Sequence, residues 1–280
     1  MATQFKAIGN NDVTKTKTLI HEAIPLTGTL VSGTYGKAPY AGLGSERNIK
    51  NFSHGMFQSV FDYPHLSSSA NHLFDVTFGY NTNSPMSGTS ARVQQEKKIN
   101  IYNQMAQVLM GHDITGGIKN FTWGPNGKEM NSCFFVNFSR LLTKDEIKKQ
   151  SFTVQVITGG VVTNPTGTLT ISDYGALTSY KTNSPAGEYG ILYTSSAAAQ
   201  GSGVGLVYYQ AGIAVLTSSI FDGNLASYIG PNMANDATTA DNYAGVSELF
   251  VSGSISGSAD AFRNRLYNIS FNNTIEINST

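Results

Sequence analysis

One aromatic-rich stretch, NFSHGMFQSVFDYPHLSSSANHLFDVTFGY at residues 51–80, concentrates side chains that are able to do chemistry. It holds three of the chain's five histidines, together with two aspartates. Imidazole and carboxylate groups bind zinc and act as general acids or bases. The histidines are 11 and 7 residues apart, so no tight pair such as H-x-x-x-H lets one turn or helix face present two ligands. We therefore predict no metal site, and expect these histidines to hydrogen-bond to the backbone at strand ends, in an interface. The residues are His54, His65 and His72, with Asp62 and Asp75.

The other candidates for acid–base or nucleophilic chemistry fall outside known catalytic patterns. His112 and Asp113 follow a predicted helix, where the helix dipole favours a histidine. His21 and Glu22 lack the second histidine of a zinc-protease motif. The single cysteine, Cys133, lies beside two phenylalanines, which is typical of a small buried apolar residue. We predict no catalytic residue.

The glycine-rich segments GSGVGLVYYQAG and ITGG are interpreted as turns. A dinucleotide-binding G-x-G-x-x-G needs a strand before it and a helix after it, whereas GSGVGLVYY runs into β-branched and aromatic residues. The sequence has no Walker motif and no G-x-S-x-G elbow, so we predict no cofactor. Acids are scarce and the chain has one tryptophan, Trp123, which gives little basis for a carbohydrate-cleaving cleft. A hydrolase whose site is assembled from distant residues stays the enzymatic alternative.

The composition favours a subunit over a freely solvated monomer. Hydrophobic residues make up 40% of the 280 residues but charged residues only 13%, about half the usual share. The net charge is zero, which argues against a dedicated, sequence-specific nucleic-acid-binding protein. No apolar run approaches the length of a membrane span, and the first residues lack the apolar core of a signal peptide. We expect no membrane insertion and a surface largely covered by neighbouring subunits.

Alternating hydrophobicity predicts that strands dominate the fold. Residues 73–80 place four apolar side chains on one face, with the period of two that a strand requires. These side chains are Phe74, Val76, Phe78 and Tyr80. Further strands are expected in HEAIPLTGTLVSGTYG, GMFQSVFDY, NSCFFVNF, SFTVQVIT, GTLTIS, GEYGILYTS, GVGLVYYQAGIAVLTS, SELFVSGSISG and NISFNNTIEINS.

The best helix is expected at about residues 91–110, with Ser90 as its N-cap and Gly111 as its C′ residue. Its apolar face is predicted to consist of Ile101, Met105, Val108 and Leu109.

Two short helices complete the predicted elements. One begins at Thr143, which has capping-box spacing to Glu146, and the other lies in SADAFRNRLYN. The prediction is an α+β fold, mainly antiparallel β and sandwich-like, with one substantial helix packed on a sheet. A soft boundary near residue 150 divides an α+β region at 1–150 from a β-rich region at 151–280, and a single domain stays possible. The last strand pattern reaches Thr280 without a finished edge, which suggests pairing with a neighbouring subunit or a chain cut short of its natural end.

Several blocks, in order along most of the chain, resemble structural proteins of tailed phages, especially marine contractile-tailed phages. The resemblance implies a virion protein, with the tail or baseplate as the first choice of location. In similar proteins the pattern continues past NNTIEINST into further strands. The blocks are NIKNFSHGMFQSVFDYPHLSSSANHLFDVTFGY (48–80), KKINIYNQMAQVLMGHD (97–113), CFFVNFSRLLTKDEIKK (133–149), NSPAGEYGILY (183–193), GLVYYQAGIAVL (205–216) and DAFRNRLYNISFNNTIEINST (260–280).

The expected function is therefore a non-enzymatic structural subunit of a phage tail or baseplate. It would act through interfaces with copies of itself and with other virion structural proteins, after assembly in the host cytoplasm. The alternatives are a capsid, neck or decoration protein of the virion, and a β-rich receptor- or carbohydrate-binding module. The binding module would need aromatics exposed along a groove, and Tyr208 and Tyr209 are the residues to test, although we expect both in the core or an interface.

Overall fold

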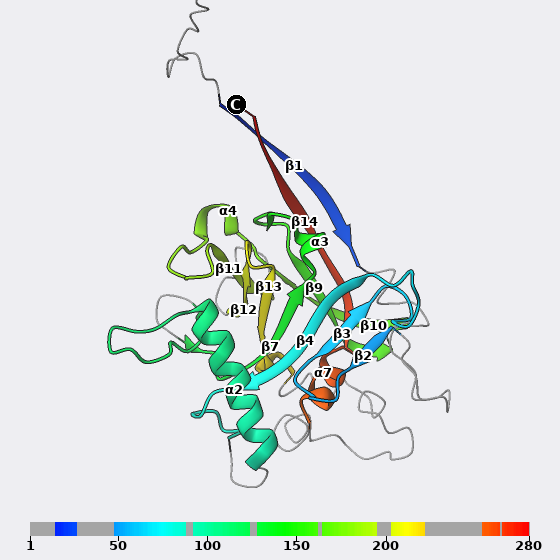
Figure 1. The fold of residues 1–280 in the computed structure, drawn as a ribbon. Coiled ribbons are helices and arrows are strands. Elements are labelled where there is room, and N and C mark those ends of the chain that lie inside the picture. Colours follow the sequence, from blue (N-terminus) through cyan, green and yellow to red (C-terminus); the bar gives the residue numbers. More distant parts are fainter. Residues whose placement is uncertain are drawn as a thin grey trace, which may run out of the picture.

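The computed structural model describes residues 15–26, 48–87, 92–123, 128–161, 164–194, 203–221, 254–263 and 265–279 (Figure 1). The strands are β1 (Thr16–Pro25), β2 (Ile49–Asn51), β3 (Gln58–Phe61), β4 (His72–Tyr80), β5 (Thr122–Trp123), β6 (Lys128–Glu129), β7 (Ser132–Phe138), β8 (Glu146–Ile147), β9 (Thr153–Val161), β10 (Asn164–Ser172), β11 (Tyr189–Tyr193), β12 (Gly203–Tyr208), β13 (Ile213–Thr217) and β14 (Leu266–Ser279). The helices are α2 (Arg92–Leu109), α3 (Arg140–Thr143), α4 (Ala176–Ser179) and α7 (Ile255–Arg263), with the 3-10 helix η3 (Ser218–Phe221).

The predicted class is confirmed, because the described part of the chain is an α+β fold dominated by antiparallel strands. One open sheet holds 12 strands, and α2 packs on it as the main helix. The order along the sheet is β1-β14-β9-β10-β11-β12-β13-β7-β4-β3-β2, and β8 pairs with β14 beside this path. Strands from both sides of residue 150 share the sheet, and the soft boundary there stays a prediction.

The strands β4 and β7 lie next to each other in the sheet and bury an aromatic face. The predicted apolar face of β4 is confirmed, because all four of its side chains are fully buried. Phe78 lies opposite Phe134 of β7, and the two ring centroids are 4.8 Å apart. Phe74 packs edge-on against Phe138 at the other end of β7, at 6.0 Å. Both strands therefore contribute aromatics to one core by the period-two alternation of their sequences.

The main helix packs on the opposite face of β4, above Gly79. A Cβ at Gly79 would lie 2.6 Å from the carbonyl oxygen of Lys98 and 2.7 Å from the amide nitrogen of Tyr102. Only a residue without a Cβ lets the helix backbone approach this closely. The Tyr102 hydroxyl donates to the carbonyl of Met130 and accepts from the amide of Phe121, both at 3.0 Å. Because this hydroxyl is buried, its two partners satisfy it and fix the helix on the sheet.

The predicted helix is confirmed with small changes. It spans Arg92–Leu109, and Gly111 ends it in the left-handed region with φ +77, where its amide donates to the carbonyl of Ala106 at 3.0 Å. Val108 was expected on the apolar face but is 61% exposed. It is about 100° around the helix from the buried Leu109, which turns it toward solvent. The predicted N-cap, Ser90, lies outside the described residues.

Two local predictions were wrong. The helix expected from Thr143 instead ends there as α3, and Lys144 follows with φ +54, which the helix cannot continue. Glu146–Ile147 forms β8 against β14, so cross-strand pairing overrides the capping-box spacing. The strand expected in SELFVSGSISG is helical where α7 begins at Ile255, and residues 247–253 lie outside the described residues. The strand expected in HEAIPLTGTLVSGTYG is present only as the end of β1, since residues 27–47 are not described.

The sheet packs against itself in a sandwich-like manner. Phe138 of β7 contacts Phe271 of β14 with ring centroids 5.2 Å apart, although these strands are far apart in the sheet order. Phe152, just before β9, contacts the same ring of Phe138 at 5.8 Å. One continuous core of buried side chains therefore joins the two ends of the sheet, and this core holds the curled sheet together.

Candidate functional site

The first histidine of the opening stretch, His54, supports a turn. Its Nδ1 accepts a hydrogen bond from the amide of Met56 at 3.0 Å, and its ring stacks on Phe52 with centroids 5.1 Å apart. The side chain lies between β2 and β3 and is exposed. The expected bond between a histidine and the backbone near a strand end is therefore present at His54.

The other two histidines of the stretch lie around one aromatic ring. His72 is opposite Phe61 in the register of β3 and β4, with ring centroids 5.5 Å apart. His65 approaches the same ring at 6.3 Å. His72 Nε2 lies 2.8 Å from Asp75 Oδ1. Asp62 instead closes the loop between the strands, because its carboxylate accepts from the backbone amide and side-chain amide of Asn71 at 2.6 and 2.8 Å.

The contacts of His72 exclude a nucleophilic triad. Ser59 Oγ donates to Asp75 Oδ1 at 2.5 Å, and His72 contacts this same oxygen. In a serine triad the imidazole lies between the hydroxyl and the carboxylate, so that it can take the proton of the serine. Here the carboxylate lies between the other two, and Ser59 is buried. Within the described ranges, no group of three or more His, Cys, Asp or Glu is placed to hold a metal ion.

The remaining sequence candidates also have structural roles. The Asp113 carboxylate accepts from the hydroxyl and amide of Thr115 and from the amide of Gly117 at 2.7–2.8 Å, and these bonds lower the pKa of Asp113. His21 Nδ1 lies 3.3 Å from Thr274 Oγ1 on the neighbouring strand. Cys133 is fully buried, and this burial raises the pKa of its thiol well above the ordinary value. A thiol that stays protonated is a poor nucleophile.

A buried carboxylate that the sequence did not single out lies at Asp173, just after β10. It accepts from the amide of Gln150 at 2.6 Å, the amide of Phe152 at 3.0 Å and the hydroxyl of Tyr209 at 3.0 Å. Burial raises the pKa of Asp173 to about 6, although the three donors oppose this rise. The Asp173 carboxylate therefore connects the turn before β9 to the ends of β10 and β12 through these hydrogen bonds. Its donors surround it, so we assign it a structural role, and no motif in the sequence marks it.

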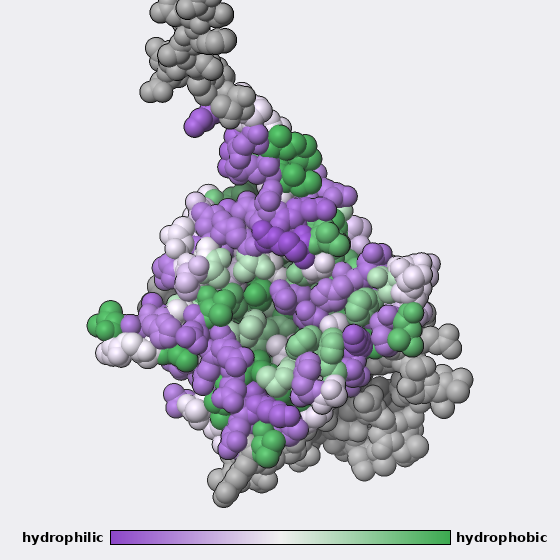
Figure 2. Space-filling model, in the orientation of Figure 1, coloured by the Kyte–Doolittle hydropathy of each residue, from purple (hydrophilic) through white to green (hydrophobic). Residues whose placement is uncertain are grey.

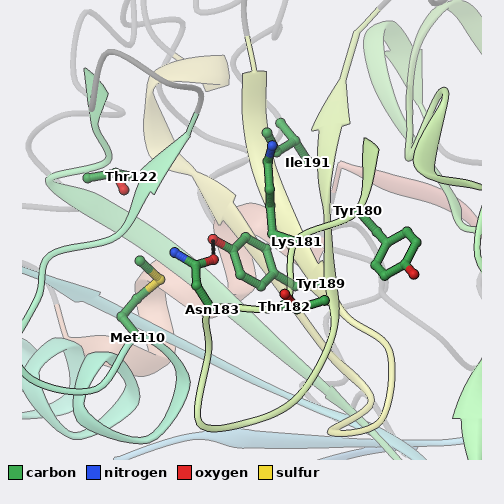
Figure 3. Close-up of a pocket in the computed structure, with 8 residues that line it drawn as sticks. All are labelled: Met110, Thr122, Tyr180, Lys181, Thr182, Asn183, Tyr189 and Ile191. Atoms are coloured by element: carbon green, nitrogen blue, oxygen red, sulfur yellow. Dashed lines mark hydrogen bonds between the residues drawn. The ribbon is translucent and has the colours of Figure 1, made fainter. Parts of the chain in front are cut away.

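A shallow hollow of about 420 Å³ lies beside β11 and the end of α2 (Figure 3). The Tyr189 hydroxyl donates to Asn183 Oδ1 at 2.9 Å across it. Tyr208 and Tyr209 do not contribute, because both are fully buried. The lining has amide, hydroxyl and ammonium groups but no carboxylate, so it is suited to holding a small polar molecule rather than to acid–base chemistry. The lining residues are Met110, Thr122, Tyr180, Lys181, Thr182, Asn183, Tyr189 and Ile191.

The most distinctive exposed feature is a two-stranded ribbon, Thr16–Ile20 of β1 with Ile275–Ser279 of β14, which we call the arm. The pairing of β1 with β14 runs unbroken over ten residue pairs, and the arm leaves the body of the protein (Figure 1). It carries hydrophobic side chains in the open, visible as a patch beside hydrophilic groups (Figure 2). Ile20 is 45% exposed and Ile277 is 47% exposed. The alternation of apolar and polar residues predicts these strands, but it does not predict that they project from the body.

Comparison with known proteins gives no assignment. No family model, no curated protein and no solved structure matches this chain. None of the described helices has the length and apolar character needed to cross a membrane.

Proposed function

We propose that this chain is a non-enzymatic structural subunit of a phage particle, located in the tail or baseplate. It works through contacts with copies of itself and with other virion proteins. The observation that carries the proposal is the arm, which places exposed isoleucines away from the body (Figure 1) and whose outer edge, along β1, pairs with none of the described strands. An exposed strand edge with an apolar face is a surface that binds another protein.

Two further observations support the proposal. The side-chain clusters that could do chemistry instead stabilise the fold. Asp75 contacts both Ser59 and His72, and Asp173 accepts hydrogen bonds from two amides and a hydroxyl. The low charge of the chain also suits a surface that neighbours cover. The ordered resemblance of its sequence blocks to tailed-phage structural proteins indicates which kind of assembly this is.

The test is to locate the chain in purified particles of the phage that encodes it. We expect mass spectrometry to find it in the intact particle, and a cryo-EM map to place it in the tail or baseplate. A position in the capsid, neck or a decoration layer would replace the proposed location with the alternative. Absence from the particle would refute the structural role.

A receptor- or carbohydrate-binding role is the second candidate, favoured by the hollow beside β11. Its exposed Asn183 and Lys181 could bond to sugar hydroxyls, with the ring of Tyr180 nearby. Binding on a glycan array that is lost in Asn183→Ala and kept in Tyr63→Ala would support this role. Tyr63 is a suitable control because it is 60% exposed and is not among the residues that line the hollow.

A further inference from the structure

The hollow beside β11 is bordered by a loop that the structure holds at both ends. The backbones of Lys181 and Tyr189 exchange two hydrogen bonds, at 2.8 and 3.0 Å, and so close the loop at residues 182–188. Within this loop the Ser184 hydroxyl donates to the carbonyl of Leu109 at the end of α2. The loop is thus tied to β11 and to the main helix, and its side chains are held in place before a ligand arrives.

Asn183 has a defined orientation in this loop. Its Oδ1 accepts from the Tyr189 hydroxyl at 2.9 Å, and the Tyr189 ring packs on the buried ring of Tyr208 with centroids 5.1 Å apart. Burial raises the pKa of Tyr189, so this hydroxyl keeps its proton and stays the donor. The side-chain nitrogen of Asn183 therefore points away from Tyr189, toward the side of the hollow with Met110 and Thr122 (Figure 3). Within the described residues, no acceptor takes its two N–H groups.

Lys181 brings a positive charge into the hollow. Among the described residues its ammonium forms no ion pair. Two acids lie close to the lining in sequence or register, and each has another partner. Glu188 pairs with Lys149 at 2.6 Å. Glu129, opposite Thr122 in the pairing of β5 with β6, accepts from a neighbouring side-chain amide at 3.3 Å. The charge of Lys181 is therefore available to a ligand.

The lining combines polar donors with apolar side chains. The hydroxyls of Thr122 and Thr182 form no hydrogen bond within the described part of the chain, and they border the hollow together with Met110, Tyr189 and Ile191. An ammonium and an amide N–H only donate, whereas a hydroxyl donates or accepts. The set therefore matches a ligand that carries one anionic group, several hydroxyls and an apolar C–H surface.

The size and shape of the hollow narrow this ligand further. A volume of about 420 Å³ lies at the lower end of the range for small-molecule sites, and it accommodates a single sugar ring. The hollow is shallow, so units linked to that ring are able to continue into solvent. A sugar ring also supplies the adjacent hydroxyls and the C–H surface that the lining matches.

We propose that this hollow binds an acidic sugar unit of a polysaccharide, a hexuronate whose carboxylate bonds to Lys181. The hydroxyls of the ring bond to the Asn183 amide and to the two threonines. A neutral hexose would leave the ammonium without a partner, and a simple anion would leave the hydroxyl-binding groups unused. This inference rests on the binding role given above as the second candidate, whose ligand it names, and it is independent of the tail or baseplate role.

NMR titration of the 280-residue chain tests the ligand class. The probes are the methyl glycosides of glucuronic, galacturonic and mannuronic acid, each beside its neutral hexoside. At least one uronate should shift the side-chain amide signals of Asn183 with a Kd of about 1 mM, roughly tenfold below that of its neutral partner. Sodium acetate is the third probe. Acetate that binds as tightly as the best uronate, or uronates that give no shift at about ten times that concentration, would overturn the proposal.

Substitutions in the hollow test the assigned contacts. Lys181→Gln should weaken uronate binding about tenfold and leave neutral hexosides unchanged, whereas Lys181→Arg should retain uronate binding. Asn183→Asp still offers an acceptor to Tyr189, but its negative charge should abolish uronate binding. Lys50→Gln is the matched control, because Lys50 is exposed on β2 and does not line the hollow. Urea unfolding shows that each variant is folded. If folded Lys181→Gln binds uronates as the normal chain does, the assignment is wrong.

Further outcomes separate the proposals from one another. A trimer of the best uronate should bind at least as tightly as the single unit, and its exclusion from the hollow would refute a polysaccharide as the source. Neutral hexosides that shift Asn183 as strongly as uronates would refute the acidic ligand and keep the binding role. A chain that binds no sugar loses both, whereas its position in phage particles decides the structural role by itself.

Discussion

At the scale of single residues, Asp173 links a buried charge to the pH dependence of stability. Burial raises its pKa to about 6 from an ordinary value of 3.8. The folded chain then holds this proton more tightly than the unfolded chain does. Its contribution to stability is therefore fully present below about pH 4 and is lost as the pH rises through about 6, to the extent of roughly 3 kcal/mol.

Asp173→Asn should remove this pH dependence and also destabilise the fold. The amide offers one oxygen to the donors at Gln150, Phe152 and Tyr209, so at least one donor loses its acceptor. We expect a loss of about 1–3 kcal/mol in the free energy of unfolding at pH 7. Urea unfolding at several pH values between 4 and 7 measures both effects. Asp113→Asn is the control, because the pKa of exposed Asp113 is lowered and its contribution has the opposite sign. An unchanged pH profile in Asp173→Asn would contradict the assignment.

His72 should have a modest structural role and none in metal binding. Its ring contacts the partly exposed Asp75 at 2.8 Å, and such pairs contribute about 0–1 kcal/mol. His72→Ala should therefore reduce the free energy of unfolding by about 1 kcal/mol or less, and leave the zinc content of the purified chain unchanged. Elemental analysis and urea unfolding measure these quantities, with His65→Ala as a parallel variant. Bound zinc that disappears in either variant would show that the histidines are ligands.

At the scale of secondary-structure elements, Gly79 sets the distance between α2 and β4. A methyl group there would meet backbone atoms of Lys98 and Tyr102, which cannot rotate away as a side chain would. Gly79→Ala should lift the helix and cost about 1–3 kcal/mol. Gly257→Ala is the control, since a Cβ there would meet only the side-chain oxygen of Ser254, just before α7, at 3.4 Å, and alanine favours a helix by about 0.5–1 kcal/mol. Thermal unfolding should move in opposite directions for the two variants, and an unchanged midpoint for Gly79→Ala would contradict the close packing.

The elements with strong periodicity could be predicted from the sequence, and the contacts between them could not. The strand His72–Tyr80 and the helix that ends before Gly111 follow from local patterns. Local patterns do not name a partner, so the pairing of β1 with β14 and the contact of Phe138 with Phe271 were out of reach. The capping-box spacing at Thr143 gave a wrong prediction, because pairing with the distant strand β14 makes Glu146–Ile147 a strand. The same limit applies to sites: Asp173 matters because three donors from distant segments meet at it.

At the scale of the whole molecule, the protein combines a body that has a buried core with an arm whose exposed isoleucines lie outside that core. Ile20 and Ile277 belong to neither buried cluster, whereas Ile269, on the same strand as Ile277, is fully buried. On the proposed function, an exposed apolar surface that adds nothing to the core serves to bind another protein. Stability and association should therefore be separable by substitution along one strand.

The double variant Ile20→Thr with Ile277→Thr tests this separation. Threonine keeps the preference for a strand and removes the apolar face, so the free energy of unfolding of the dilute chain should change by about 0.5 kcal/mol or less. On the proposed function, incorporation into particles should fall when the variant replaces the normal chain during assembly, because the two exposed isoleucines of the arm no longer offer apolar area. Ile269→Thr is the matched control: it removes the same groups inside the core and should cost about 2 kcal/mol or more in urea unfolding. If the double variant unfolds as easily as Ile269→Thr, the arm is part of the core; if particles incorporate the double variant normally, the apolar face has no role in assembly.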